Sequence, residues 1–123
     1  MRIGVDMVEI GRFGRAMKLS SGLASRMFTP GELEIAKRFG PRRREQFLAG
    51  RFAVKEAVLK ALGTGIGGDI ELTDIESLPV ASGAPQLKFL GAARDALSSH
   101  ALTRYNVSLS HDAGFVMAFV VLT

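Results

Sequence analysis

Residues 45–62 read EQFLAGRFAVKEAVLKAL and carry the strongest helix signal in the chain. The segment is built from Ala, Leu, Glu, Lys, Arg and Phe, and its one helix-disfavouring residue is Gly50. It runs into a glycine-rich segment, GTGIGG at residues 63–68, of a kind that ends helices. A long helix over residues 45–62 is therefore predicted, and the remaining elements are expected to pack around it.

A rotation of about 100° per residue divides this helix into two arcs. The broad apolar arc, expected to face the core, holds Phe47, Leu48, Phe52, Val54, Val58, Leu59 and Leu62. The opposite arc holds the small residues Ala49, Gly50, Ala53 and Ala57. Glu56 and Lys60 lie among them, one turn apart and therefore adjacent. Such a pair is usually a surface ion pair, but small residues also let a second element or a ligand approach, which would place Glu56 in a partly closed cleft.

Two basic residues, Arg51 and Lys55, interrupt the apolar arc, so their head groups must reach solvent or meet an anion. A phosphate would satisfy both. The glycine-rich residues 63–68 allow close backbone approach, but they follow a helix and lack the Gly-Lys-Ser/Thr ending of a phosphate-binding P-loop. Spacing alone therefore favours a helix C-cap with a flexible connection.

The N-terminal residues 3–10 are apolar on both alternate faces and predict a buried strand, with Asp6 near its middle. A charged residue in a buried strand is rare unless it is paired, hydrogen-bonded or bound to metal. Asp6 and Glu56 together would suit Mg²⁺, since the chain has no Cys and only 2 His. The alternative is that Asp6 accepts backbone hydrogen bonds or pairs with Arg12.

The rest of the chain alternates short helical and strand patterns. Thr29, Pro30 and Glu32 form a capping-box pattern that predicts the start of a helix. The predicted elements are a helix within residues 11–26 broken at 20–22, a helix at 30–38, a hairpin of strands 70–80 and 86–90, a helix at 91–102, and a hairpin of strands 105–110 and 115–122. No repeat or linker is visible, so the fold class is α+β: a single domain, residues 1–123, whose mostly antiparallel sheet packs on one long helix.

Composition limits the function classes. The 123 residues, 47% hydrophobic and 23% charged, fit one globular domain. A net charge of +4 and a pI near 10.0 favour acidic partners: phosphates, nucleic acid or an acidic protein. The lack of cysteine excludes disulfides, thiolate-bound zinc and thiol catalysis. Asp6 and Glu9 interrupt the N-terminal apolar stretch, and the apolar run at 115–122 is shorter than the about 20 residues of a membrane span, so a cytoplasmic protein is expected.

Three segments taken together resemble the holo-[acyl carrier protein] synthases, the short bacterial type of 4'-phosphopantetheinyl transferase. They are GVDMVEI at residues 4–10, FLAGRFAVKEAVLKALGTGIG at 47–67 and VSLSH at 107–111. The resemblance runs from end to end and includes FTPGEL at residues 28–33 and the GAP turn at 83–85. It implies the phosphopantetheinyl transferase fold. It also implies Mg²⁺-dependent transfer of the phosphopantetheine arm of coenzyme A to a serine of apo acyl carrier protein, in fatty acid biosynthesis, leaving adenosine 3',5'-bisphosphate.

The resemblance also assigns roles to individual residues. Asp6 and Glu56 match metal-binding carboxylates. The positions matching those near the coenzyme A phosphates are Arg51, Lys55, Lys60 and His111, with Gly63 and Thr64 near the nucleotide. Arg12 and Arg43 resemble positions that meet the acidic recognition helix of the carrier protein, and Arg42 and Arg44 would add to that charge.

The implied mechanism is in-line attack of the carrier serine on the β-phosphate, with Mg²⁺ and Lys60 neutralising the charge on the pyrophosphate and the departing group. The acceptor of the serine proton stays open among Glu56, a water on the metal and His111. Family members of this type are homotrimers with active sites between subunits. A mean hydropathy of +0.20 and a strand at 115–122 that is apolar on both faces agree with apolar surface buried between chains.

Two rival functions are weighed against this one. A basic nucleic-acid-binding module is supported by the pI and by Arg42-Arg43-Arg44. Few aromatics, scattered basic residues and the lack of any helix-turn-helix, RNA-recognition or zinc signature disfavour it. A non-catalytic trimeric scaffold is disfavoured because Asp6, Glu56 and Lys60 are all present.

Overall fold

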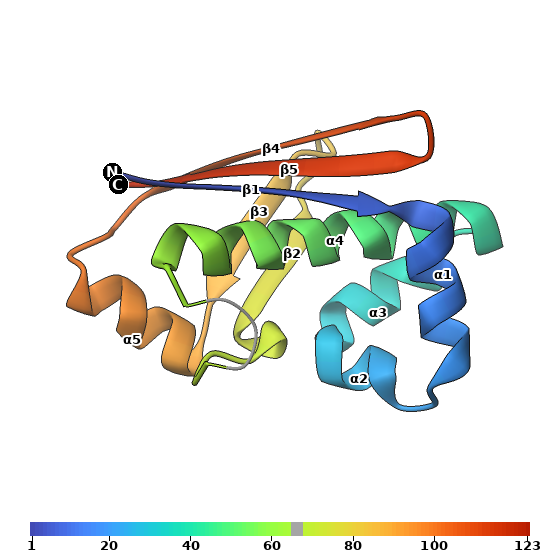
Figure 1. Ribbon diagram of the computed structural model, residues 1–123, viewed down its shortest axis with the longest axis horizontal. Helices are drawn as coiled ribbons and strands as arrows, with labels where there is room; N and C mark the ends of the chain where they lie inside the picture. Colours follow the sequence, from blue (N-terminus) through green and yellow to red (C-terminus); the bar gives the residue numbers. More distant parts are fainter. Residues whose placement is uncertain (65–67) are drawn as a thin grey trace.

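A long helix, α4 (Pro41–Leu62), lies against one face of a three-stranded antiparallel sheet, and the shorter helices gather toward its two ends (Figure 1). The computed structural model describes residues 1–64 and 68–123. The other elements are β1 (Arg2–Glu9), α1 (Ile10–Leu19), α2 (Leu23–Met27), α3 (Pro30–Ala36), a 3-10 helix η1 (Leu72–Asp74), β2 (Ile75–Pro79), β3 (Pro85–Phe89), α5 (Gly91–Ser99), β4 (Tyr105–Asp112) and β5 (Phe115–Leu122). The predicted α+β class with a mostly antiparallel sheet is confirmed.

Helix α4 begins at Pro41, earlier than the predicted start at Glu45, because a proline is well suited to the first turn, where its missing N–H has no partner to lose. It ends as predicted: Gly63 adopts a left-handed conformation with φ 78°, and its N–H bonds back to the last turn. The arc of small residues is fully buried at Ala49, Ala53 and Ala57. A second element, the sheet, covers this arc.

The strands follow the order β1-β5-β4, and all pairs are antiparallel. Strands β4 and β5 are joined by a two-residue turn, Ala113 and Gly114, which have positive φ values of 51° and 81° as tight hairpin turns require. Strand β1 contacts α4 at Gly4, where an added Cβ would lie 1.8 Å from the carbonyl oxygen of Ala57. Only glycine permits this approach, and it brings the middle of β1 onto the last turns of the helix.

One face of the sheet is open, which corrects the prediction that residues 3–10 form a strand buried on both faces. Burial alternates along β1 and β5. The outward side chains, each between 40% and 62% exposed, are Ile3, Val5, Met7, Phe115, Met117 and Phe119. We call these six residues the outer apolar face. Helix α4 covers only the other side of the sheet, so a single chain leaves them in solvent.

The hairpin of β2 and β3, which forms a separate two-stranded sheet, is shorter than predicted. Residues 70–80 were expected to be one strand, but Leu72–Asp74 forms a 3-10 turn in which the Asp74 carboxylate accepts a hydrogen bond from the Glu71 N–H. Helix α5 ends at Ser99, before the predicted end at Leu102. The capping box at Thr29 and Glu32 is confirmed, and it starts α3. No helix in the described part of the chain combines the length and apolarity needed to cross a membrane.

Candidate functional site

The first candidate site is a cleft of about 390 Å³ at the end of β1, lined by Asp6, Glu9, Arg12 and Glu56 together with apolar side chains of α1 and Phe52 of α4. Lys60 Nζ lies 2.9 Å from Asp6 Oδ1 and 3.1 Å from the carbonyl oxygen of Val5. The expected neighbourhood of Asp6, Glu56 and Lys60 is thus present. Asp6 pairs with Lys60 and not with Arg12.

Glu56 is buried in this cleft, and its Oε1 has no hydrogen-bond partner among the described residues. Burial raises the pKa of the Glu56 carboxyl above its ordinary value; the nearby Asp6 charge raises it further, and Lys60 partly opposes both effects. A buried oxygen without a partner is costly unless a ligand completes it. Glu56 is therefore in a position to bind a cation or to accept a proton.

The donors fit a magnesium ion in part. Two carboxylates converge on one cleft and one of their oxygens is unpartnered, which suits a hard cation that prefers oxygen. Within residues 1–64 and 68–123 no group of three or more His, Cys, Asp or Glu is arranged to hold a metal. The remaining positions of an octahedral ion would fall to water and to phosphate oxygens of a substrate, as is usual for Mg²⁺.

A second cleft, of about 350 Å³, is cationic. Arg43, Arg51 and His111 line it together with Phe39 and Phe47. The Arg43 guanidinium lies 4.4 Å from the centre of the Phe39 ring, and that of Arg51 lies 4.2 Å from the centre of the Phe47 ring. These stacked guanidinium groups face a space large enough for an anionic group. Arg51 is otherwise buried, and burial lowers the pKa of its guanidinium while the Glu32 charge opposes this.

Lys55 lies in neither cleft: its head group does not reach solvent but meets an anion inside the protein, the second of the two outcomes expected from its place on the apolar arc. Its side chain is 0% exposed, and Nζ lies 2.7 Å from Glu32 Oε1. The same nitrogen donates to the carbonyl oxygens of Leu72 and Ile75, at 2.8 and 2.6 Å. These three partners use every donor of an ammonium group. Lys55 does meet an anion, but the anion is a carboxylate of its own chain.

The two residues that match positions near a nucleotide lie at the C-terminal end of α4. Gly63 and Thr64 form the C-cap of α4, and the Thr64 N–H bonds to the Leu59 carbonyl oxygen. Neither residue lines either cleft. The next three positions of the glycine-rich segment, 65–67, lie outside the described residues.

The basic residues expected to meet a carrier protein are divided between the two clefts: Arg12 lines the carboxylate cleft and Arg43 the cationic one. Arg42 lines a shallower hollow that also includes His111. Arg44 donates to the carbonyl oxygens of Ala36 and Phe39, so its side chain ties the end of α3 to the start of α4.

The sequence pattern indicated Glu32 only as a helix-capping residue and not as the buried counter-ion of Lys55. The signal available was Lys55 itself, because a lysine on an apolar helix arc needs an opposite charge. Nothing in the spacing singles out Glu32 among the twelve acidic residues of the chain. Glu32 of α3 and Lys55 of α4 meet only in the folded chain, so no local sequence pattern indicates that they pair.

Comparison with known proteins agrees with this arrangement. The family model of the 4'-phosphopantetheinyl transferase superfamily matches residues 2–120. The holo-[acyl-carrier-protein] synthase of Clavibacter sepedonicus is 42% identical over 119 residues, covering 97% of this chain and 92% of that protein. The enzyme of the same name from Latilactobacillus sakei is 41% identical over 120 residues, covering 98% of this chain and 94% of that protein.

Solved structures are similar as well. The holo-[acyl-carrier-protein] synthase of Neisseria meningitidis superposes with a TM-score of 0.88 at 35% identity, covering 99% of this chain and 97% of that one. The Helicobacter pylori synthase, solved in complex with coenzyme A, gives 0.83 at 30% identity, covering 98% and 99%.

Proposed function

Because this chain belongs to the 4'-phosphopantetheinyl transferase superfamily, we propose that it is a holo-[acyl carrier protein] synthase. The whole chain, residues 1–123, acts as one domain. It transfers the 4'-phosphopantetheine arm of coenzyme A to a serine of apo acyl carrier protein and releases adenosine 3',5'-bisphosphate. The similarity to curated synthases covers nearly the whole chain, and related synthases have been solved with coenzyme A.

The observation that carries this proposal is the pair of carboxylates in the first cleft, one of them buried. Asp6 and Glu56 share a cleft, Glu56 Oε1 is unpartnered, and Lys60 stands beside them with its ammonium on Asp6. Asp6 and Glu56 would hold Mg²⁺. The chemistry that this ion supplies when bound is neutralisation of negative charge on the pyrophosphate oxygens of coenzyme A.

The Lys60 ammonium is the positive charge of this site that can exchange its partner. Its side chain is 54% exposed, so its ammonium can leave Asp6 for a phosphate oxygen without the cost of dehydration that a buried lysine pays. Lys60 would neutralise charge on the leaving group, and positioning of the serine and the phosphate would supply most of the rate. Of the two side chains that could accept the serine proton, Glu56 lines this cleft and His111 lines the other.

The cationic cleft would bind the anionic nucleotide end of coenzyme A. Arg51 and Arg43 are held with their guanidinium planes over Phe47 and Phe39, and such stacked groups present paired donors to phosphate. His111 lies at the same cleft and would add a further donor. The acidic carrier protein would dock beside the carboxylate cleft, where Arg12 is exposed.

We further propose that three copies assemble through the outer apolar face. Cross-strand pairs Val5–Phe119 and Met7–Met117 make this face continuous across β1 and β5. A continuous apolar surface of this kind marks an interface. Assembly would also allow the cationic cleft of one subunit to meet the carboxylate cleft of the next, so that His111 and Glu56 serve one active site.

The test is the intact mass of an apo acyl carrier protein after incubation with this protein, coenzyme A and Mg²⁺. The expected result is a mass gain of one phosphopantetheine arm, which is absent when EDTA is added. A folded protein that modifies none of several carrier proteins would contradict the proposal. The rival nucleic-acid-binding function receives no support from the relatives found.

A further inference from the structure

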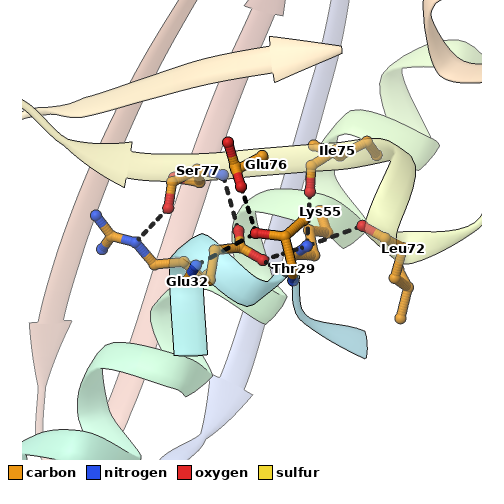
Figure 2. A network of polar contacts seen from close by, with 8 residues as sticks. Thr29, Glu32, Lys55, Leu72, Ile75, Glu76 and Ser77 are labelled. Carbon is orange, nitrogen blue, oxygen red and sulfur yellow. Dashed lines mark hydrogen bonds and ion pairs between the residues drawn. The ribbon is translucent and has the colours of Figure 1, made fainter. Parts of the chain in front are cut away.

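A buried carboxylate, that of Glu32, ties together α3, α4 and β2 (Figure 2). Glu32, at the start of α3, is 0% exposed. Its Oε1 accepts hydrogen bonds from Lys55 Nζ at 2.7 Å and from the Thr29 N–H at 2.9 Å. Its Oε2 accepts one from the Ser77 N–H of β2 at 2.8 Å. Both oxygens are thus committed, and all their donors come from the protein interior.

Lys55 makes the burial of this carboxylate possible. Its ammonium supplies the opposite charge, and its other two donors bind main-chain oxygens at Leu72 and Ile75. A buried ion pair stabilises a fold weakly compared with an apolar pair of the same size. Stability alone therefore does not explain this ion pair, and the contacts of Ser77 indicate a second role for it.

Ser77 connects Glu32 to the cationic cleft. Its N–H is held by Glu32, and its carbonyl oxygen accepts a hydrogen bond from Arg51 Nε at 3.1 Å. The N–H and C=O of one residue therefore lie between the buried carboxylate and a guanidinium group that lines the cleft. A shift of Ser77 moves the acceptor that orients Arg51. The guanidinium group of Arg51 also lies over the Phe47 ring, which offers no hydrogen-bond acceptor to direct its donors.

We propose that Glu32 is a positioning residue that acts through the Ser77 main chain to orient Arg51 for binding the anionic end of coenzyme A. This inference rests on the proposed function, since it names the ligand that Arg51 meets. Glu32 touches no substrate in this arrangement. Its substitution should weaken coenzyme A binding while turnover at saturating coenzyme A stays close to that of the wild type, because none of the residues that Glu32 bonds to lines the Asp6–Glu56 cleft.

The experiment is a double-mutant cycle of Glu32→Gln with Arg51→Ala, read by titration calorimetry with coenzyme A in EDTA. The Lys55 ammonium would hold the oxygen of the introduced amide at the Oε1 position, so the NH₂ group would face the Ser77 N–H, whose hydrogen bond Glu32 accepts in the wild type. We expect Glu32→Gln to weaken binding about tenfold, and to weaken it no further when Arg51 is already replaced by Ala. Independent, additive losses would overturn the proposal, and so would unchanged binding in Glu32→Gln.

Two controls separate positioning from loss of stability. Ile75→Val shortens a fully buried side chain of the same strand without removing a hydrogen-bonding group, and its coenzyme A affinity should equal that of the wild type. Glu76→Gln changes a carboxylate on β2 itself, next to Ser77. This carboxylate accepts a hydrogen bond from Thr29 Oγ1 and none from Ser77. It should also bind normally. A tenfold loss in either control would overturn the proposal.

A matched pair covers the case in which Glu32→Gln leaves Lys55 unpaired and does not fold. The variants Glu32→Gln/Lys55→Met and Glu32→Met/Lys55→Met both lack the two charges. In the first, no ammonium holds the amide oxygen, so this oxygen can accept the hydrogen bond of the Ser77 N–H; in the second, no acceptor remains. The second should bind coenzyme A about tenfold more weakly. Equal affinities would contradict the proposal.

Failure of the proposed function would look different. A wild-type protein that neither binds coenzyme A nor modifies a carrier protein would contradict the function alone. The ¹⁵N-bound Nε proton of Arg51 then still reports on positioning, because its exchange with solvent should be slow in the wild type and fast in Glu32→Gln. Slow exchange in both would overturn the positioning role.

Discussion

At the scale of single residues, two lysines of α4 that are only five positions apart have very different surroundings. Lys55 is fully buried with every donor used, and Lys60 is half exposed with its ammonium on Asp6. The sequence places both in one motif, and both carry the same charge. Their surroundings give Lys55 a structural role and leave the ammonium of Lys60 accessible from solvent.

Substitution of each lysine by Met should separate these roles. Lys55→Met leaves Glu32 as an unpaired buried charge and should cost about 3–5 kcal/mol of unfolding free energy. Lys60→Met should cost about 0–1 kcal/mol, because exposed pairs contribute little, but should lower the transfer rate by at least about 100-fold. Urea unfolding and the intact-mass assay measure the two effects. A Lys60→Met protein with wild-type rate would remove Lys60 from the mechanism.

Substitution of Glu56 by Gln should lower activity strongly without lowering stability. Its carboxylate is buried and partly unpartnered, which raises its pKa, so Glu56→Gln removes a charge that the folded state disfavours. We expect unfolding free energy that is equal to or above that of the wild type, and a transfer rate lower by about 1000-fold. Mg²⁺ should raise the melting temperature of the wild type but not that of Glu56→Gln. A loss of folding in this variant would instead give Glu56 a structural role.

The residues of the carboxylate cleft could be predicted from the sequence, because a charge inside an apolar strand and a Glu–Lys pair among small residues are local anomalies. The partner of Lys55 could not be predicted. Glu32 meets Lys55 across α3 and α4, and no periodicity reports a contact of that kind. The exposure of one side of β1 also escaped prediction, because an apolar strand reads the same whether its own chain or another copy covers it.

At the scale of elements, the site depends on how closely β1 approaches α4. Gly4 lies against the Ala57 carbonyl, and this contact sets Asp6 beside Glu56 and Lys60. The sequence indicated a close approach through the small residues of the helix. It did not indicate that glycine on the strand is the other half of the contact.

Gly4→Ala should therefore destabilise the protein strongly. The new Cβ would lie 1.8 Å from a backbone oxygen, and backbone cannot give way as a flexible side chain can. We expect a loss of about 3 kcal/mol or more in urea unfolding, together with loss of transfer activity. Gly50→Ala is the matched control: its Cβ would have ordinary contact at 3.7 Å from Val116, and Ala favours a helix, so stability should rise by about 0.5–1 kcal/mol. Equal effects of the two changes would contradict this account.

At the scale of the whole molecule, the outer apolar face and the two separated clefts lead to the same expectation. A single chain exposes the face and holds its cationic and carboxylate clefts apart. Assembly would bury the face and could complete each active site with residues of a second subunit.

Met117→Lys should yield a folded monomer of low activity, since a lysine at the middle of the face is tolerated in solvent but not in an apolar interface. Sedimentation velocity and the transfer assay measure this outcome. Ser98→Lys, at an exposed position of α5 away from the sheet, is the control and should leave the assembly intact. A wild-type protein that sediments as a monomer at micromolar concentration would contradict the assembly.

Mixed assemblies test whether active sites are shared. Glu56→Gln and Arg51→Ala, each assayed alone at low coenzyme A, should be nearly inactive. Refolding them together should restore part of the activity, because some sites would then combine an intact Glu56 from one subunit with an intact Arg51 from another. Activity that never exceeds the sum of the separate variants would show that each site lies within one chain.

The order of the strands has a consequence for how the chain is made. β5 is the central strand of the sheet and pairs with both β1 and β4, yet it comes after every other element in the sequence. During synthesis on the ribosome, β1 and α4 emerge long before β5, the strand that pairs with β1 and also packs on α4. The surfaces of β1 and α4 that β5 covers stay exposed until it emerges. We therefore expect chaperones to protect the nascent chain until β5 emerges, and the three-stranded sheet to form only then.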